Sequence, residues 1–222
     1  MPTVYSQTTK GTLWTMARGA FIVIDGMDGS GKGTQMRLLQ TALSGGSFLF
    51  TREPGGTPRA EEIRTELLRH GGAPSNPVCD FFLFWAARGS HIEDAVEPAR
   101  ARGVHVISDR YDSSTFAFQI YGEEHRALEP VFHAVRSSLP EYYRPDAYII
   151  LDLPAEVAFK RRTADVAQEK SKFDVRPIAY HQRVRDGFLA LTSFAPTHYI
   201  DANRTPEEMH RDVLRVVSAC AV

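Results

Sequence analysis

The amino-acid sequence predicts a single α/β domain in which helices cover both faces of a five-stranded parallel sheet. Apolar runs of strand length alternate with segments of helical periodicity, the order that builds a parallel sheet. The first run, residues 21–24, is continuously apolar, as expected for a strand that is buried on both faces. With 222 residues, 43% of them hydrophobic and 24% charged, the chain has the size and composition of one globular domain.

Each expected strand is a short apolar run followed by polar or glycine-rich residues. Ligands of open parallel sheets bind at the carboxyl ends of the strands, so functional residues are expected in the segments that follow. The expected strands are residues 21–24, 47–50, 104–107, 147–151 and 199–200.

The expected helices lie between the strands and carry their own start and stop signals. Met36, Leu39 and Leu43 recur at helical spacing before the Gly45-Gly46 pair ends their helix. The last helix has Thr205 as its N-cap, a proline at its first position and a glutamate three residues after the cap. Further helices are expected at residues 60–69 and 77–88.

Charge and cysteine content exclude several classes of protein. The 26 basic and 27 acidic residues give a formal net charge of -1, so the chain as a whole is not attracted to nucleic acid or to an anionic membrane. Cys79 and Cys220 are too few for a disulfide framework and lack metal-ligand spacing. No apolar run approaches the roughly 20 residues of a membrane span. We expect a cytoplasmic protein with reduced thiols that binds neither nucleic acid nor membrane.

The first residues differ from the rest of the chain. Residues 1–15 contain one lysine, no arginine and no acidic residue, and they lack the apolar centre of a secretion signal. We expect residues 1–19 to form a disordered extension before one folded domain, residues 20–222.

A phosphate-binding loop follows the first strand. Gly26–Lys32 matches the pattern G-x-x-x-x-G-K and opens an expected helix, which predicts a P-loop NTPase fold. Glycines let backbone N–H groups converge on an anion, and Lys32 supplies a mobile charge for the terminal phosphates. A simple glycine-rich turn with a solvated lysine is the weaker interpretation. The residues expected to bind ATP are Gly26, Met27, Asp28, Gly29, Ser30, Gly31, Lys32, Gly33 and Thr34.

The loop departs from the usual pattern at one position. Gly33 stands where Ser or Thr normally follows the lysine and contacts Mg²⁺ through its hydroxyl, and Thr34 comes one residue later. We therefore expect Mg²⁺ to be held by water, phosphate oxygens and an aspartate.

Charged residues also follow two other expected strands, at the same edge of the sheet. The run 104–107 leads to Asp109 as a Walker B strand does, with Arg110 directly after it, and no guanine-reading Asn-Lys-x-Asp motif follows. After the second strand, the sequence Pro54-Gly55-Gly56 predicts a tight turn that holds Arg52 at this edge. An exposed loop arginine is the alternative.

Phe84 and Arg88 are four residues apart and share one face of an expected helix. A ring and a guanidinium on one face can stack on a nucleobase and donate to its carbonyl. The neighbouring aromatic residues Phe81, Phe82 and Trp85 suit a hydrophobic core equally well, so this pattern leaves both interpretations open.

Together, these segments resemble the thymidylate kinases. The last of the matching segments, residues 180–185, is similar to the helix that follows the lid of that family. The resemblance runs from about residue 20 to residue 217. The other matches are Gly-x-Asp-Gly-x-Gly-Lys at 26–32, Thr-Arg-Glu-Pro-Gly-Gly-Thr at 51–57, Phe-x-Ala-x-Arg at 84–88 and Asp-Arg-Tyr-x-x-Ser-Thr-x-Ala-Phe-Gln at 109–119.

The resemblance implies roles for the matched residues. Arg52 would bind the phosphate of the acceptor nucleotide, and Arg110 would neutralise charge between donor and acceptor phosphates. Phe84 would stack on thymine while Arg88 reaches its O4. Asp109 would help to position Mg²⁺. The remaining residues implied to bind dTMP are Asp28, at the 3′-OH, and Pro54, Ser114, Thr115, Phe118 and Gln119.

The resemblance also implies a mobile lid at about residues 161–176. Some relatives carry a catalytic arginine in the P-loop, but Gly29 occupies that position here, so the lid should supply the cation. Arg161 and Arg162 are the first candidates to join Lys32, Arg52 and Arg110 as catalytic residues. Lys172 and Arg176 are further candidates, because Ser171–Asp174 replaces the Asp-Arg-Phe-Glu of many relatives; a solvated loop is the alternative.

The activity implied by the resemblance is transfer of the γ-phosphate of ATP to dTMP, giving dTDP and ADP in dTTP biosynthesis. Such an enzyme would need Mg²⁺ and would work as a homodimer. Two alternatives stay open. The first is another nucleoside monophosphate kinase, which the adenylate kinase-like sequence Lys32–Gln35 favours. The second is a nucleotide-dependent switch on the same fold.

Overall fold

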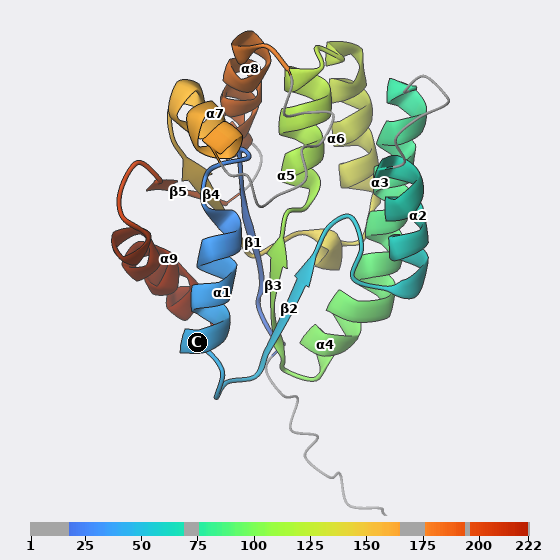
Figure 1. Cartoon of the computed structure of the whole chain (residues 1–222). Coiled ribbons are helices and arrows are strands. Elements are labelled where there is room, and N and C mark those ends of the chain that lie inside the picture. Colours follow the sequence, from blue (N-terminus) through green and yellow to red (C-terminus); the bar gives the residue numbers. More distant parts are fainter. Residues whose placement is uncertain (1–17, 69–75, 165–175, 194–195, 222) are drawn as a thin grey trace, which may run out of the picture.

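The structure is a computed structural model, and it describes residues 18–68, 76–164, 176–193 and 196–221. Within these ranges the chain forms the predicted five-stranded, all-parallel sheet, with strand order β2-β3-β1-β4-β5. Helices surround the sheet (Figure 1). The prediction of an α/β fold with a parallel sheet is therefore confirmed. The strands are β1 (Phe21–Gly26), β2 (Phe48–Arg52), β3 (His105–Asp109), β4 (Ala147–Asp152) and β5 (Thr197–Asp201).

The sheet register brings the strand ends that carry the predicted motifs together. β1 is buried at all six positions, as its continuous apolar sequence predicts. Ile24 pairs with Asp109, and Arg52 pairs with Asp109 from the other side. The residues that follow β1, β2 and β3 therefore meet at one edge of the sheet.

Nine α-helices lie within the described residues. Figure 1 shows α9 beside α1 and α2 beside α3, and both pairs are in contact. The α-helices are α1 (Lys32–Ala42), α2 (Pro58–Leu68), α3 (Pro77–His91), α4 (Glu97–Ala101), α5 (Asp112–Ser114), α6 (Glu129–Ser138), α7 (Ala155–Ala164), α8 (Ile178–Leu189) and α9 (Pro206–Cys220). Two π-helical segments, η1 (Ile92–Val96) and η2 (Thr115–Gly122), continue α3 and α5, and three 3₁₀ turns are η3 (Arg126–Leu128), η4 (Glu141–Tyr143) and η5 (Ala190–Ser193).

Two glycines allow η2 and α8 to pack closely. A Cβ atom added to Gly122 would lie 2.6 Å from Val184 Cγ2, and one added to Gly187 would lie 2.8 Å from Ala117 Cα. Both distances are shorter than a real contact allows. The close approach of η2 and α8 is therefore possible only because glycine has no side chain. The sequence analysis did not anticipate η2 as a helix, although its residues carry part of the predicted site.

The predicted N-terminal extension, residues 1–19, and the predicted lid, about residues 161–176, lie partly outside the described residues. Residues 1–17 and 165–175, including Lys172, are not among them. Gly19, which we expected to belong to the extension, is buried, and its N–H donates to Arg100 O at 2.9 Å. Helix α7 continues to Ala164, so the expected lid begins within a helix.

Within the part of the chain that the structure describes, no helix has both the length and the apolar character needed to cross a membrane. Cys79 is exposed, Cys220 is partly buried, and both are free thiols.

Candidate active site

A cavity of about 1120 Å³ lies at the carboxyl edge of the sheet. Its walls come from the loops that follow β1, β2 and β3 and from α3, η2 and α7. Most of the residues predicted for the site line this cavity, whereas Gly26, Met27 and Ser30 do not. The side chains of Met27 and Ser30 are buried, with exposures of 2% and 0%.

The loop between β1 and α1 has the backbone of an anion cradle. Gly26, Gly29 and Gly31 have φ values of 143°, 84° and 92°, which favour glycine over every other residue. A Cβ atom on Gly29 would lie 2.3 Å from Ala158 O, so a side chain at this position would require the backbone of α7 to shift. Glycine thus lets α7 approach the loop closely.

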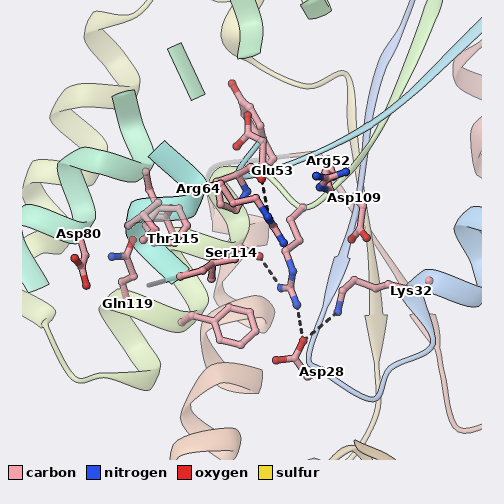
Figure 2. A pocket seen from close by; sticks show the side chains of 18 of the residues that line it. Asp28, Lys32, Arg52, Glu53, Arg64, Asp80, Asp109, Ser114, Thr115 and Gln119 are labelled. Atoms are coloured by element: carbon pink, nitrogen blue, oxygen red, sulfur yellow. Dashed lines mark hydrogen bonds and ion pairs between the residues drawn. The ribbon is translucent and has the colours of Figure 1, made fainter. Parts of the chain in front are cut away.

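Lys32 lies within this loop and reaches back across it. Its Nζ donates to Gly26 O at 2.7 Å and to Met27 O at 2.9 Å. Figure 2 shows the ion pair of Lys32 with Asp28, whose Oδ1 lies 4.0 Å from Nζ. Burial lowers the pKa of Lys32, and the charge of Arg110 lowers it further. The buried Lys32 ammonium contacts two carbonyl oxygens and lies near one carboxylate. A phosphate anion bound beside it would stabilise its positive charge further.

Arg110 is the most constrained side chain of the site. Its φ of 71° is unusual for a residue other than glycine and costs on the order of 1–3 kcal/mol. Its Nη2 donates to Asp28 Oδ1 at 2.5 Å and its Nη1 to Ser114 Oγ at 3.0 Å (Figure 2). Burial alone would lower the pKa of Arg110, but Asp28, Asp25 and Asp109 outweigh it and raise the pKa. Arg110 therefore stays charged at the centre of the cavity.

Asp25 is a buried support for Arg110 that sequence reasoning missed. It is fully buried and accepts hydrogen bonds from Ser113 Oγ at 2.7 Å, Ser114 Oγ at 2.8 Å and Gly26 N at 2.8 Å. Arg110 Nη1 lies 3.4 Å from its Oδ1. Burial raises the pKa of Asp25 even though Arg110 and Lys32 oppose that shift. An acidic residue in an otherwise apolar strand was the available sequence signal.

Two further arginines lie where β2 ends. Arg52, 54% exposed, donates from Nη2 to Glu61 Oε1 at 2.8 Å. Arg64 on α2 lines the same cavity, and its Nη1 donates to Pro54 O at 2.8 Å. Burial lowers the pKa of Arg64, and the charges of Arg52 and Arg110 lower it further. Sequence reasoning missed Arg64, although its spacing of three residues from Glu61 was a signal.

The aromatic residues of α3 divide between core and cavity. Phe81 is fully buried in the core, while Phe84 lines the cavity and Phe82 is 49% exposed. Arg88 is 1% exposed and lies between two rings, 4.5 Å from that of Trp85 and 5.0 Å from that of Tyr111. The core interpretation therefore holds for Phe81, whereas binding of a nucleobase by Phe84 and Arg88 stays a prediction.

Several buried polar atoms around the cavity have no partner among the described residues. Arg88 donates from Nε to Glu53 Oε2 at 2.9 Å and from Nη2 to Thr115 Oγ1 at 3.3 Å, but its Nη1 has no acceptor. Gln119 Oε1 has no donor, and neither has Asp109 Oδ1. Figure 2 shows Thr115 and Gln119 at the opposite end of the cavity from Lys32. Unpaired buried polar atoms are costly, so these atoms indicate where a polar ligand binds.

The predicted lid cations have different surroundings. Arg161 is exposed, and its Nη1 donates to Ala202 O at 2.8 Å. Arg162 is partly buried, and its charge is among those that, together with Arg110 and Lys32, lower the pKa of Asp28 against the opposing effect of burial. Arg176 donates to Glu123 Oε1 at 2.8 Å. All three arginines line the cavity.

Among the described residues, no group of three or more His, Cys, Asp or Glu side chains is arranged to hold a metal ion. Asp109, the predicted metal-positioning residue, has an unpaired buried carboxylate oxygen in the cavity wall. A single carboxylate beside a phosphate cradle suits a Mg²⁺ ion that shares its ligands with phosphate and water.

The glycine-rich loop with Lys32 and the arginines Arg52, Arg64 and Arg110 line one and the same cavity. This arrangement on a P-loop fold defines a P-loop nucleoside monophosphate kinase. The family model described as thymidylate kinase matches residues 24–213. The chain belongs to the thymidylate kinase family, and the prediction of an enzyme that phosphorylates thymidylate is thereby confirmed.

Individual relatives agree with the family match over nearly the whole chain. A thymidylate kinase from Nitratidesulfovibrio vulgaris is 35% identical over 207 residues, which cover 89% of this chain and 95% of the relative. The thymidylate kinases of Gluconobacter oxydans and Symbiobacterium thermophilum are each 38% identical. They align over 90% and 89% of this chain and over 94% and 92% of their own lengths.

Proposed function

We propose that this chain transfers the γ-phosphate of ATP to dTMP, giving dTDP and ADP, and that it does so with the residues that line the cavity. The observation that carries this proposal is the shared cavity itself, in which the cradle of Lys32 and the arginines of the acceptor side face each other. Two nucleotides bound there meet with their phosphates end to end. The reaction is one step in the supply of dTTP.

The acceptor phosphate binds among Arg52, Arg64 and Arg110. Three guanidinium groups in one cavity repel one another, and the lowered pKa of Arg64 reflects its burial and that repulsion. A phosphate monoester with about two negative charges relieves the repulsion and satisfies their free N–H groups. Arg110 also donates to Asp28, which belongs to the loop proposed to bind the phosphates of ATP. The Arg110 guanidinium can therefore stabilise negative charge between the two phosphates.

The base of dTMP binds between η2 and α3. Phe84 stacks on the ring, Arg88 Nη1 donates to O4, and Gln119 Oε1 accepts from the N3–H, so that both unpaired atoms gain a partner. The same carbonyl and N–H occur in uracil, whereas cytosine presents an amino group at position 4 and would leave Arg88 Nη1 unpaired. The sugar lies near Asp28 and Phe118, and the remaining contacts come from Pro54, Ser114 and Thr115.

The phosphates of ATP bind to the loop from Gly26 to Thr34. Met27 and Ser30 contribute their backbone only, because their side chains are buried. Bound Mg²⁺ would supply charge neutralisation between the β- and γ-phosphates. Asp109 fits such an ion through its unpaired Oδ1, and Gly33 leaves the other ligand positions to water and phosphate oxygens.

The chemistry needs alignment and positive charge rather than a base. The acceptor is already anionic at neutral pH, so no protein side chain has to remove its proton. Lys32, Arg52 and Arg110 hold the reacting groups in line and offset their charge. Arg162 is the lid cation best placed to assist, since its charge acts on Asp28.

Two exposed apolar side chains on α3 support a proposal about assembly. Val78 and Phe82, 52% and 49% exposed, lie one turn apart on α3 and offer an apolar contact for a second copy of the chain. We propose a homodimer formed through this helix, in the cytoplasm.

The proposal is tested by an ADP-release assay with ATP, Mg²⁺ and a panel of dTMP, dUMP, dCMP and AMP, with dTDP identified directly as a product. We expect turnover with dTMP, less with dUMP and little with dCMP or AMP. Turnover with AMP but not with dTMP would favour an adenylate kinase-like enzyme. ATP binding without any transfer would favour a nucleotide-dependent switch.

A further inference from the structure

A chain of buried polar side chains runs behind the base pocket. Thr51 Oγ1 lies 2.8 Å from His91 Nε2, His91 Nδ1 lies 2.8 Å from Glu53 Oε1, and Glu53 Oε2 accepts from Arg88 Nε at 2.9 Å. His91, Glu53 and Arg88 are 0%, 4% and 1% exposed. The chain starts on β2, passes through α3 and ends at the unpaired Nη1 of Arg88. His91 lies outside the cavity wall and takes no part in the proposed chemistry.

The hydrogen bonds fix the orientation of the His91 ring. The Glu53 carboxylate accepts from Arg88 through Oε2, and its Oε1 accepts from His91 Nδ1. Nε2 faces the Thr51 hydroxyl, which can either donate or accept. Both ring nitrogens therefore have a partner.

His91 fixes the carboxylate that aims Arg88. Each oxygen of Glu53 has its own partner, so the carboxylate cannot rotate without breaking one of the two bonds. Arg88 is in turn held by Nε and Nη2, which leaves Nη1 as the one nitrogen of its guanidinium without a protein acceptor among the described residues. Without His91, Oε1 of Glu53 would lose its partner and the carboxylate could turn away from Arg88.

The loop after β2 is packed on the same imidazole. A Cβ atom on Gly56 would lie 2.8 Å from His91 Cδ2 and 2.5 Å from Thr51 Oγ1. Arg52 is the last residue of β2 and lies between Thr51 and Glu53, so the His91 side chain contacts both neighbours of the arginine proposed to bind the acceptor phosphate. A shift of His91 would therefore disturb recognition at both ends of dTMP.

We infer that His91 is a positioning residue for thymine recognition, acting through Glu53 on Arg88. The inference rests on the proposed function, in which Arg88 Nη1 donates to O4 of the base. It predicts that loss of the His91–Glu53 bond weakens dTMP binding and the preference for a carbonyl at position 4, while ATP binding is unchanged.

Two conservative variants separate the two hydrogen bonds of the imidazole. The amide nitrogen of His91→Asn can take the place of Nδ1 and keep the bond to Glu53, whereas the amide group of His91→Gln reaches the place of Nε2 and keeps only the bond to Thr51. His91→Ala removes both. Ile92→Val is the matched control, because Ile92 is the next residue, is equally buried and does not touch Glu53 through a polar group.

The measurements are KM for dTMP, KM for ATP, the ratio of kcat/KM for dTMP over dCMP, and the melting temperature. We expect His91→Gln and His91→Ala to raise KM for dTMP about tenfold and to lower the dTMP preference about as much, the loss of one charge-assisted hydrogen bond. His91→Asn and Ile92→Val should stay within about threefold of wild type. KM for ATP should not change in any variant.

Three outcomes would overturn the inference. These are an unchanged KM for dTMP in His91→Gln and His91→Ala, an equal rise in KM for both substrates, or equal impairment of His91→Asn and His91→Gln. If no His91 variant folds, Glu53→Gln decides instead, because a single amide oxygen cannot accept from both His91 and Arg88: a selective rise in KM for dTMP supports the chain of contacts, and no rise refutes it. A wild-type enzyme that does not phosphorylate dTMP refutes the proposed function itself, whatever the variants do.

Discussion

Replacing Arg110 by alanine should lower kcat by about a thousandfold. The side chain is 23% exposed and sits among three carboxylates, so an effective dielectric constant of about 20 is appropriate for its interactions. One unit charge about 4 Å from the moving phosphoryl group then contributes about 4 kcal/mol. Since about 1.4 kcal/mol corresponds to a factor of ten in rate, the loss is about three orders of magnitude.

The same substitution should leave the fold largely intact while disturbing its neighbours. Asp25 would keep only Lys32 as a nearby cation, and its already raised pKa should rise further. Arg110→Gly would in addition relieve the positive φ of 71°, so it should be more stable than Arg110→Ala and equally slow. Arg110→Lys keeps a charge but cannot bind Asp28 and Ser114 together, and should fall between.

The assay is coupled ADP release at saturating ATP and dTMP, with circular dichroism and thermal melting to check the fold. A kcat of Arg110→Ala within tenfold of wild type, in a folded protein, would refute the argument from charge. Equal kcat values for Arg110→Lys and Arg110→Ala would show that a positive charge at this position does not by itself raise kcat.

Three other substitutions test separate parts of the structure. Phe84→Ala should raise KM for dTMP about tenfold or more, because base stacking contributes about 1–3 kcal/mol, and should leave KM for ATP unchanged; an unaltered KM for dTMP would argue against stacking. Thr205→Ala removes the capping box of α9, in which Thr205 Oγ1 accepts from Glu208 N at 3.3 Å, and should cost about 1 kcal/mol, or about 2–4 °C in a melting experiment. Burial lowers the pKa of His210 below 6.5, so the unfolded chain binds more protons as the pH falls through that value and the folded state loses stability there. Melting temperatures measured from about pH 7.5 to about pH 5.5 should therefore fall less in His210→Gln than in wild type, and parallel curves would contradict this reasoning.

Sequence reasoning succeeded where a local pattern has one structural solution. The pattern at 26–32 predicted a glycine-rich loop between the first strand and the first helix, and the structure has this loop, with positive φ at Gly26, Gly29 and Gly31. The capping signal at Thr205 predicted the start of α9 to the residue. In both cases the residues that determine the geometry are neighbours in the chain.

Sequence reasoning failed where a residue gains its importance from a distant partner. In the sequence, Asp25 is a polar residue at the end of an apolar strand, and Arg64 resembles an ordinary solvent-exposed helix residue. His91 belongs to no sequence motif. Each is joined to the site by contacts across 38 to 89 residues of chain or by a shared cavity wall, which local pattern does not reveal.

The amino-acid sequence by itself determined the parallel sheet, the phosphate loop and the family, because strand hydrophobicity and glycine conformation act over a few residues. Only the tertiary structure decided which side of the aromatic helix faces the cavity, how closely α7 approaches Gly29, and how Glu53 and His91 hold Arg88. The physical reason is that burial and hydrogen-bond satisfaction depend on surfaces that meet only when the strands and helices are packed together.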